Sequence, residues 1–329
     1  MTDIEICSNV HEKNLVRWAE DKPKVVVLSA DLTNSTEIGL FRRTYPNRFF
    51  SLGIAEQNMV SFAGGLSREG FIPFVHTFAV FLYRRAYDQI AMSVAYPNLP
   101  VKLFGFLPGV TTPGGATHQA IEDIAVMRAL PNMTVLECGD AADVESVPDI
   151  VYGLDGPVYV RMLRGDIPRL FGGKMRLGQA RLLSQGTELA LLSSGICTQE
   201  ALRAVAALKK TGVSVGHLHI STLKPFNDSL VMETLSRARG GVITMENHTI
   251  IGGLGSAAAE LMAENGIAKR LIRIGLQDTF LHGASRGYLM KEYGIDAPAV
   301  IKAAGRLLNK KIMLPESPSL AKKKGNAEL

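Results

Sequence analysis

The sequence predicts an α/β protein with two domains, each a mainly parallel sheet flanked by helices. Three observations support this fold class. Short apolar runs typical of buried strands alternate with longer amphipathic runs typical of helices, which is the pattern of parallel sheets covered on both faces. The 329 residues suffice for two ordinary domains. A Gly-rich change of pattern at residues 171–178 separates two such alternating regions.

The N-terminal region, residues 1–172, is expected to form the larger domain. Each expected strand is a short run of apolar residues, and each expected helix repeats apolar residues at helical spacing. A loop rich in Gly, Pro and Thr occupies residues 107–117. The predicted strands are 24–28, 49–52, 71–76, 101–106, 134–137 and 158–161, and the predicted helices are 9–20, 53–70, 78–94 and 121–129.

The C-terminal region, residues 179–309, is expected to form a smaller domain with strands at 189–192, 213–218, 241–246 and 271–274. We expect Thr198 to cap a helix that ends at Lys210. The turn at 252–255 opens a helix, but its glycine spacing is not that of a dinucleotide site, so we expect close helix–sheet packing there. Residues 310–329 are predicted to form a basic, solvated and mobile tail.

Composition excludes several function classes. Hydrophobic residues make up 47% and charged residues 20%, as in ordinary globular proteins, and no run approaches the roughly 18 apolar residues of a membrane helix. The first residues lack the pattern of a signal peptide, and the three cysteines lack metal-binding or redox spacing. We therefore expect a cytoplasmic protein with no metal of its own. The net charge of +5 lies partly in the tail, which argues against nucleic-acid binding.

Glu56 stands out by its position. An expected strand ends before Gly53, and Glu56 then opens the helix that follows. The turn between a strand and a helix of a parallel sheet is where ligand-facing groups usually lie. Two interpretations are open from position alone: a carboxylate that stabilises the helix N-terminus, or one that faces a ligand.

Four segments together resemble the transketolase family. They are Ser29-Ala-Asp-Leu-Thr33, Gly53-Ile-Ala-Glu-Gln57, the aromatic stretch from His76 through Phe81 to Gln89, and Gly115-Ala-Thr-His-Gln119. The resemblance extends over residues 14–307 and corresponds to the second half of a transketolase. It implies a pyrimidine-binding domain followed by a transketolase C-terminal domain.

The resemblance implies a role for several of these residues. In that family the corresponding glutamate hydrogen-bonds the N1′ atom of the aminopyrimidine ring of thiamine diphosphate, which would make Glu56 both catalytic and cofactor-binding. Ile54, Phe78 and Phe81 would contact the cofactor, with Phe81 stacked on the pyrimidine. His118 would be a catalytic and substrate-binding residue. Without the resemblance, both phenylalanines would be assigned to the core, and His118 to the start of a helix.

The sequence contains only part of a thiamine diphosphate site. Enzymes of this family bind the diphosphate through Mg²⁺, which a Gly-Asp-Gly motif and a later Asn hold. Here Gly139-Asp140 is followed by Ala141, and Gly165-Asp166 is followed by Ile167. The resemblance therefore implies a partner, an N-terminal transketolase-like subunit with the Mg²⁺ motif, and an α2β2 heterotetramer.

The expected substrate site departs from the family pattern. Arg161 or Arg164 matches an arginine that binds substrate phosphate. The other polar contacts of the family fall on smaller or apolar residues: its arginine on Ser8, its histidine on Phe106 or Leu107, and its aspartate on Gly114. These departures predict at least one substrate that is less polar than a pentose phosphate, or that binds its anion elsewhere.

Together these features predict the C-terminal subunit of a split, transketolase-like transferase. It would use thiamine diphosphate to transfer a two-carbon ketol unit, or the remainder of a decarboxylated 2-oxo acid, to an aldehyde or related acceptor. Two alternatives stay open from the sequence. One is the β-type subunit of a 2-oxo acid dehydrogenase, and the other is a non-catalytic homologue that keeps the fold.

Overall fold

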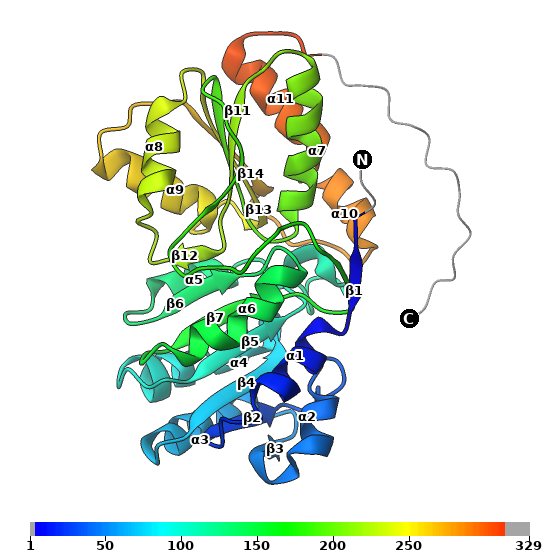
Figure 1. Cartoon of the computed structure of the whole chain (residues 1–329), viewed down its shortest axis with the longest axis vertical. Coiled ribbons are helices and arrows are strands. Elements are labelled where there is room, and N and C mark those ends of the chain that lie inside the picture. Colours follow the sequence, from blue (N-terminus) through cyan, green and yellow to red (C-terminus); the bar gives the residue numbers. More distant parts are fainter. Residues whose placement is uncertain (1–3, 313–329) are drawn as a thin grey trace, which may run out of the picture.

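The computed structural model describes residues 4–312, which form two α/β domains stacked one above the other (Figure 1). The strands of the N-terminal sheet are β2 (Val25–Ser29), β3 (Phe49–Ser51), β4 (Ile72–Phe78), β5 (Lys102–Phe106), β6 (Thr134–Glu137), β7 (Val158–Met162) and β12 (Thr222–Lys224). Their order is β12-β6-β7-β5-β4-β2-β3. All neighbours pair in parallel except β12, which is antiparallel to β6.

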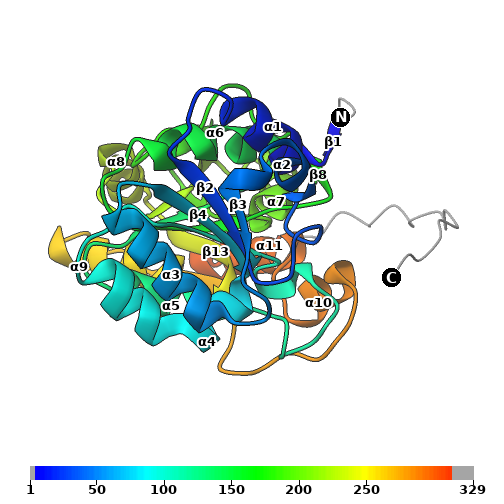
Figure 2. The ribbon, with the colours of Figure 1, turned by 90° about the horizontal axis from the view of Figure 1, so that it is seen from below.

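Helices cover both faces of this sheet, as the view from below shows (Figure 2). Strands β2, β5 and β7 are buried along their whole lengths because a helical layer lies on each side. One layer contains α1 (Val10–Trp18), α2 (Gly39–Thr44) and α6 (Ala141–Tyr152), and the other contains α3 (Glu56–Arg68), α4 (Ala79–Gln89) and α5 (Asp123–Ala129).

The C-terminal domain has the same architecture on a smaller scale. Its strands are β9 (Arg181–Ser184), β10 (Leu189–Ser193), β11 (Val215–His219), β13 (Gly241–Thr249) and β14 (Leu271–Leu276), in the order β14-β13-β10-β11-β9 with β9 antiparallel. Its helices are α7 (Cys197–Lys210), α8 (Ser229–Arg237), α9 (Leu254–Glu264), α10 (Arg286–Glu292) and α11 (Ala297–Leu308). Helices α7 and α11 lie on one face of the sheet, and α8 and α9 on the other (Figure 1). The predicted fold class is confirmed.

Three short strands, β1 (Ile6–Ser8), β8 (Asp166–Pro168) and β12, were not expected from the sequence. Strand β12 lies in the C-terminal half of the chain yet completes the sheet of the N-terminal domain, where Leu223 is fully buried. Strands β1 and β8 form a separate antiparallel pair. Strands β1, β8 and β12 have three residues each and lack the apolar run that marks the equally short β3, so the sequence did not reveal them. One strand from the C-terminal half of the chain therefore belongs to the sheet of the N-terminal domain.

Two helix predictions need correction. Thr198 does not cap α7, which begins one residue earlier at Cys197 with Ile196 in the capping position. Thr198 is fully buried instead, and its hydroxyl lies 2.7 Å from Nδ1 of His219 and 2.9 Å from Oγ of Ser193. The helix predicted at 78–94 begins at Ala79 and changes at Ile90 to a π-helical turn, so Phe78 belongs to the end of β4.

The Gly-rich turn before α9 packs closely against the sheet, as predicted. A Cβ atom on Gly253 would lie 1.9 Å from Oε2 of Glu246. The backbone amides of Leu254 and Gly255 donate to the Glu246 carboxyl at 2.7 and 2.8 Å. Burial raises the pKa of Glu246 to about 8. A side chain of the protein thus fills the position that a bound phosphate would need.

Among residues 4–312, the structure has no helix that combines the length and the apolar character needed to cross a membrane. Of the predicted tail, residues 310–329, only the first three belong to the part of the chain that the structure describes. The prediction for residues 313–329 lies outside the described residues.

Candidate active site

Glu56 is the first residue of α3 and follows the carboxyl end of β3. Gly53 has a φ of 73°, a left-handed conformation that makes the turn between the strand and the helix possible. The Glu56 side chain is only 1% exposed. Oε2 lies 2.6 Å from Nη1 of Arg85, whereas Oε1 is buried without a hydrogen-bond partner. Buried carboxylate oxygens are normally paired, so Oε1 indicates a position for a bound donor.

Arg85 is a residue of this site that the sequence did not reveal. It lies on α4 and reaches across to α3, where it forms an ion pair with Glu56. Its guanidinium carbon also lies 4.8 Å from the ring centre of Phe81. The Arg85 side chain is 41% exposed, so this ion pair lies at the edge of the site rather than in the core. No local pattern links residues 29 positions apart, and only the packing of α3 on α4 brings them together.

Phe78, Phe81 and His118 lie together beside this ion pair. The rings of Phe78 and Phe81 stack with centroids 5.7 Å apart, and the His118 ring meets Phe81 edge-on at 5.4 Å. All three side chains are half-buried, which leaves part of each ring accessible. Arg84 donates to the carbonyl oxygen of Ala116 at 2.9 Å and so fixes the loop before His118 to α4. The structure therefore brings Glu56, the two phenylalanines and His118 into one continuous group.

Gly114, which stands where the family pattern has aspartate, has a steric reason to be glycine. A Cβ atom at this position would lie 2.8 Å from both Cβ and Cγ of His118. Contacts below 3.0 Å would force the histidine or the loop to move. The loop thus depends on a residue without a side chain to hold His118 against Phe81.

Ile54 is 74% exposed in the isolated chain. It precedes Glu56 by two residues, in the turn between β3 and α3. Its contact with a cofactor stays a prediction.

The expectation that Arg161 binds substrate is wrong. Its side chain is fully buried, and all five N–H donors have partners. The guanidinium forms ion pairs with Asp123 at 2.7 Å and Glu137 at 2.6 Å. It donates further to the carbonyl oxygens of Ala120 and Asn247, and Asn247 belongs to the C-terminal domain. Arg161 therefore joins the two domains and has no donor left for a ligand.

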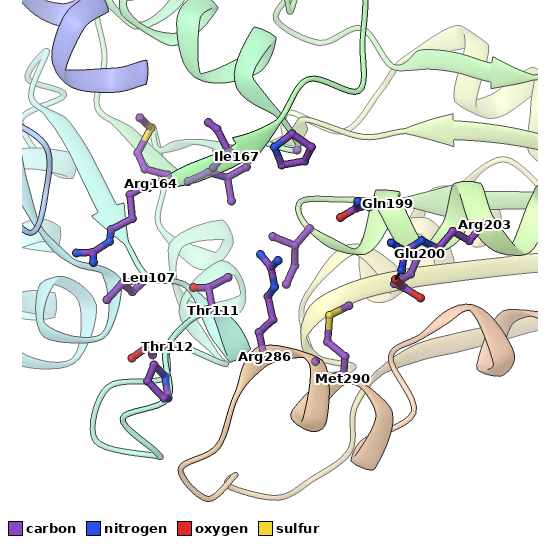
Figure 3. A pocket seen from close by; sticks show the side chains of 18 residues that line it. Leu107, Thr111, Thr112, Arg164, Ile167, Gln199, Glu200, Arg203, Arg286 and Met290 are labelled. Carbon is purple, nitrogen blue, oxygen red and sulfur yellow. Dashed lines mark hydrogen bonds and ion pairs between the residues drawn. The ribbon is translucent and has the colours of Figure 1, made fainter. Parts of the chain in front are cut away.

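Arg164, three residues later, lies on the wall of a cavity of about 550 Å³ between the two domains (Figure 3). Its Nη1 donates to the carbonyl oxygen of Ser35 at 2.7 Å, and the side chain is exposed. Leu107 also lines this cavity, whereas Phe106 is fully buried. Ser8 is exposed, and its hydroxyl donates to Asp166. Of the two residues that could replace the family's histidine, only Leu107 faces the cavity.

The described residues do not form a metal site: among residues 4–312, no group of three or more His, Cys, Asp and Glu side chains is arranged to hold a metal ion. The two aspartates that follow glycine both have structural partners. Asp140 caps α6 by accepting from the amide of Asp143, and it also accepts from the amides of Leu170 and Phe171. Asp166 accepts from Ser8.

Comparisons with known proteins identify both domains. Residues 7–169 match the transketolase pyrimidine-binding domain, and residues 178–300 match the transketolase C-terminal domain. The chain belongs to the transketolase family. The resemblance that the four sequence segments indicated is therefore confirmed.

Two transketolase relatives resemble this chain over most of their own length. A putative transketolase C-terminal section of Methanocaldococcus jannaschii is 38% identical over 88% of this chain and 92% of its own. The 6-deoxy-6-sulfo-D-fructose transketolase subunit SqwH of Clostridium sp. strain MSTE9 is 38% identical over 90% of this chain and 92% of its own. Each of them therefore covers the same two transketolase domains.

A solved transketolase structure has the same fold. It is a split-gene transketolase described as an inactive β4 tetramer, and it is 38% identical to this chain. The match has a TM-score of 0.84 and covers 92% of this chain and 97% of the other. The two chains therefore share both transketolase domains and their relative arrangement.

The residues around Glu56 fit the aminopyrimidine end of thiamine diphosphate, the cofactor of transketolases in general. The unpaired Oε1 of Glu56 can form the hydrogen bond to a ring nitrogen that a planar heterocycle offers. Phe78 and Phe81 provide an aromatic surface of the kind on which such a ring stacks. The two aspartates that follow glycine do not offer a comparable site for the Mg²⁺ and diphosphate end, because Asp140 and Asp166 both have protein partners in the described part of the chain.

Proposed function

We propose that this chain is the C-terminal subunit of a two-subunit, thiamine diphosphate-dependent transketolase-like enzyme that transfers a two-carbon ketol unit to an aldehyde or related acceptor. One observation supports this most strongly: the buried Glu56 keeps one carboxylate oxygen without a partner, next to Phe81 and His118. A non-catalytic homologue has no need for this arrangement. Burying an unpaired carboxylate oxygen costs free energy that a bound ligand would recover.

In this proposal, each residue acts on a defined atom or surface. When bound, the cofactor would supply a nucleophilic carbon for the transfer reaction. Glu56 would donate or share a proton with the pyrimidine nitrogen through Oε1, while Arg85 fixes the orientation of its carboxyl group through Oε2. Phe78 and Phe81 hold the ring by stacking. His118 faces the substrate and exchanges protons with its oxygen atoms.

The partner is proposed to supply the Mg²⁺ and diphosphate site. The sequence has no Gly-Asp-Gly motif, and the Glu56 site is open on the side of Ile54. The relatives named as a transketolase C-terminal section and a transketolase subunit support a divided enzyme. We propose an N-terminal transketolase-like subunit as this partner, and an α2β2 assembly.

The first test measures cofactor binding with and without the partner. We expect the isolated chain to show no tight Mg²⁺-dependent binding of thiamine diphosphate, because its sequence lacks the Gly-Asp-Gly motif that holds Mg²⁺ and the diphosphate. We expect the reconstituted complex to contain one cofactor per pair of subunits, as isothermal titration calorimetry would measure. A dissociation constant of about 1 µM or below for the isolated chain would contradict the divided site. A complex that binds no cofactor would indicate a non-catalytic homologue.

The second test concerns the substrate. Ser8, Leu107 and Gly114 replace charged or polar groups that would pair with the hydroxyls and phosphate of a pentose phosphate. Hydroxyls buried without partners cost about 1–3 kcal/mol each, so this site disfavours that substrate. The relative that acts on a sulfonated sugar supports a different anionic group, and we propose that Arg164 contributes to binding it.

A substrate panel with the reconstituted complex would measure kcat/KM for xylulose 5-phosphate, 6-deoxy-6-sulfofructose, an unphosphorylated ketose and several 2-oxo acids. We expect xylulose 5-phosphate to be at least about tenfold worse than the best substrate, the ratio that 1.4 kcal/mol produces. The highest value with xylulose 5-phosphate would contradict the altered site. Activity with 2-oxo acids alone would favour a 2-oxo acid dehydrogenase β-type subunit.

A further inference from the structure

The cavity between the domains has walls from both of them. The N-terminal domain contributes the loop after β5, from Leu107 to Pro113, and the chain after β7, around Arg164. The C-terminal domain contributes the first turns of α7 and α10, with Gln199, Arg203 and Arg286. Its volume of about 550 Å³ lies in the range of ligand-binding cavities. Cavities at domain interfaces are common binding sites.

The charged groups of this cavity are mostly arginines. Figure 3 shows Arg286 reaching from α10 toward the middle of the cavity, with Arg164 on the opposite wall. Within residues 4–312, no hydrogen bond or ion pair engages the guanidinium of Arg286. Arg203 is paired with Glu200, the only carboxylate in the lining. Three arginines against one carboxylate leave a positive cavity that favours an anion.

The cavity also has an apolar surface between its charged groups. Met162, Ile167, Ile196 and Met290 line the cavity between the arginines. Leu107 has a φ of 55°, a left-handed conformation that non-glycine residues rarely adopt outside functional or tightly constrained sites. An inorganic ion would leave this apolar surface unused, whereas an organic anion would cover it.

We propose that this cavity binds a small organic anion, with a phosphate, sulfonate or carboxylate group on Arg286 and a carbon skeleton against the apolar wall. A second acidic group of the ligand would reach Arg164. None of Glu56, Phe81 and His118 lines this cavity, although the loop from Leu107 to His118 runs between the two. The cavity shares Arg164 with the proposed substrate site and adds Arg286 from the C-terminal domain. The proposal does not depend on the catalytic role of Glu56, because the cavity needs only this chain.

The test titrates the full chain with 3-phosphoglycerate, which has an acidic group at each end, and with inorganic phosphate. Chloride at equal ionic strength serves as the reference, and calorimetry measures the affinity. We expect saturable one-site binding that is tighter for 3-phosphoglycerate than for phosphate. Arg286→Gln removes charge-assisted hydrogen bonds and should weaken the binding by about 10-fold to 100-fold. Arg237→Gln, an exposed arginine on α8 outside the cavity, should leave it unchanged.

A second variant fills the cavity without removing a charge. Gly287 lines the cavity, and a Cβ atom on it would meet no atom within 4 Å, so Gly287→Leu should fold normally and block binding. Gly172→Leu is the matched control, because its Cβ position is equally free and it lies outside the lining. Unchanged binding in both Arg286→Gln and Gly287→Leu, or no saturable binding by the wild type, would overturn the proposal.

The source of the anion can be distinguished with the reconstituted complex. If the ligand is the acidic end of the substrate, 3-phosphoglycerate should raise the apparent KM without lowering kcat, and Gly287→Leu, which blocks the cavity, should raise the KM of the substrate in the absence of 3-phosphoglycerate. If the ligand is a separate metabolite, the affinity measured by calorimetry should stay the same in the presence of saturating substrate. Either result agrees with an anion site in this cavity.

Discussion

Replacing Glu56 by glutamine is expected to lower the kcat of the reconstituted enzyme on the order of 10² to 10⁴-fold, the usual contribution of a general acid–base group. The amide has nearly the shape of the carboxylate but cannot share a proton in the same way. The Glu56 side chain is 1% exposed, and among residues 4–312 its Oε1 has no hydrogen-bond partner, so no neighbouring group of the described chain can replace it there. Steady-state kinetics with saturating cofactor measures the effect.

The matched control is Glu260→Gln. Glu260 is also paired with a single arginine, Arg128, at 2.6 Å, but it is 58% exposed and lies on α9, away from Glu56. This variant should keep the wild-type rate. Both variants should have the circular dichroism spectrum of the wild type. If Glu56→Gln turns over within about twofold of the wild type, Glu56 has no proton-transfer role in the reaction.

Replacing Arg161 by methionine is expected to reduce the free energy of unfolding by about 3–5 kcal/mol, as when one partner of a buried ion pair is removed. The change leaves Asp123 and Glu137 buried without their counter-charge. Burial alone lowers the pKa of Arg161, but the negative charges of these two carboxylates raise it above its ordinary value, so the arginine is charged in the native state. Urea denaturation of the single chain, followed by fluorescence, measures the loss.

Arg237→Met is the control for Arg161→Met. Arg237 is 63% exposed and paired with Glu233 one helical turn away, and such a pair contributes at most about 0.5 kcal/mol. Adding Asp123→Asn and Glu137→Gln to Arg161→Met should recover part of the lost stability, because neutral amides cost less to bury than unpaired charges. A loss below about 1 kcal/mol for Arg161→Met would show that this network does not hold the two domains together.

Buried polar contacts also hold the two domains in their relative position. Arg161 donates to the carbonyl oxygen of Asn247, and Nε2 of His219 lies 3.0 Å from the Asp143 carboxylate across the domain boundary. Both sets of atoms are fully buried. Polar groups buried in an interface cost free energy unless they are paired, so they favour one relative position of the domains over others. The same fixed position defines the walls of the cavity that contains Arg286.

The sequence by itself determined the fold class and the identity of the Glu56 segment. Alternating apolar strands and amphipathic helices are local patterns, and burial of a parallel sheet on both faces produces them directly. Glu56, Phe81 and His118 could be proposed as site residues because each lies in a short contiguous motif, and their roles stay predictions. The absence of a Gly-Asp-Gly motif could also be read from the sequence, because such a motif consists of three consecutive residues.

Only the tertiary structure decided which charged groups meet. Arg161 and Arg164 are three residues apart and equivalent in the sequence, yet one is fully paired in the core and the other lies on an open cavity. The tertiary structure also pairs Arg85 with Glu56. It places Leu223, from the C-terminal half of the chain, in the sheet of the N-terminal domain. The physical reason is the same in each case. The sequence pattern indicates which faces of a segment are buried. Which group pairs with a charge, or which strand pairs with a three-residue strand, depends on contacts between segments that are distant in the sequence.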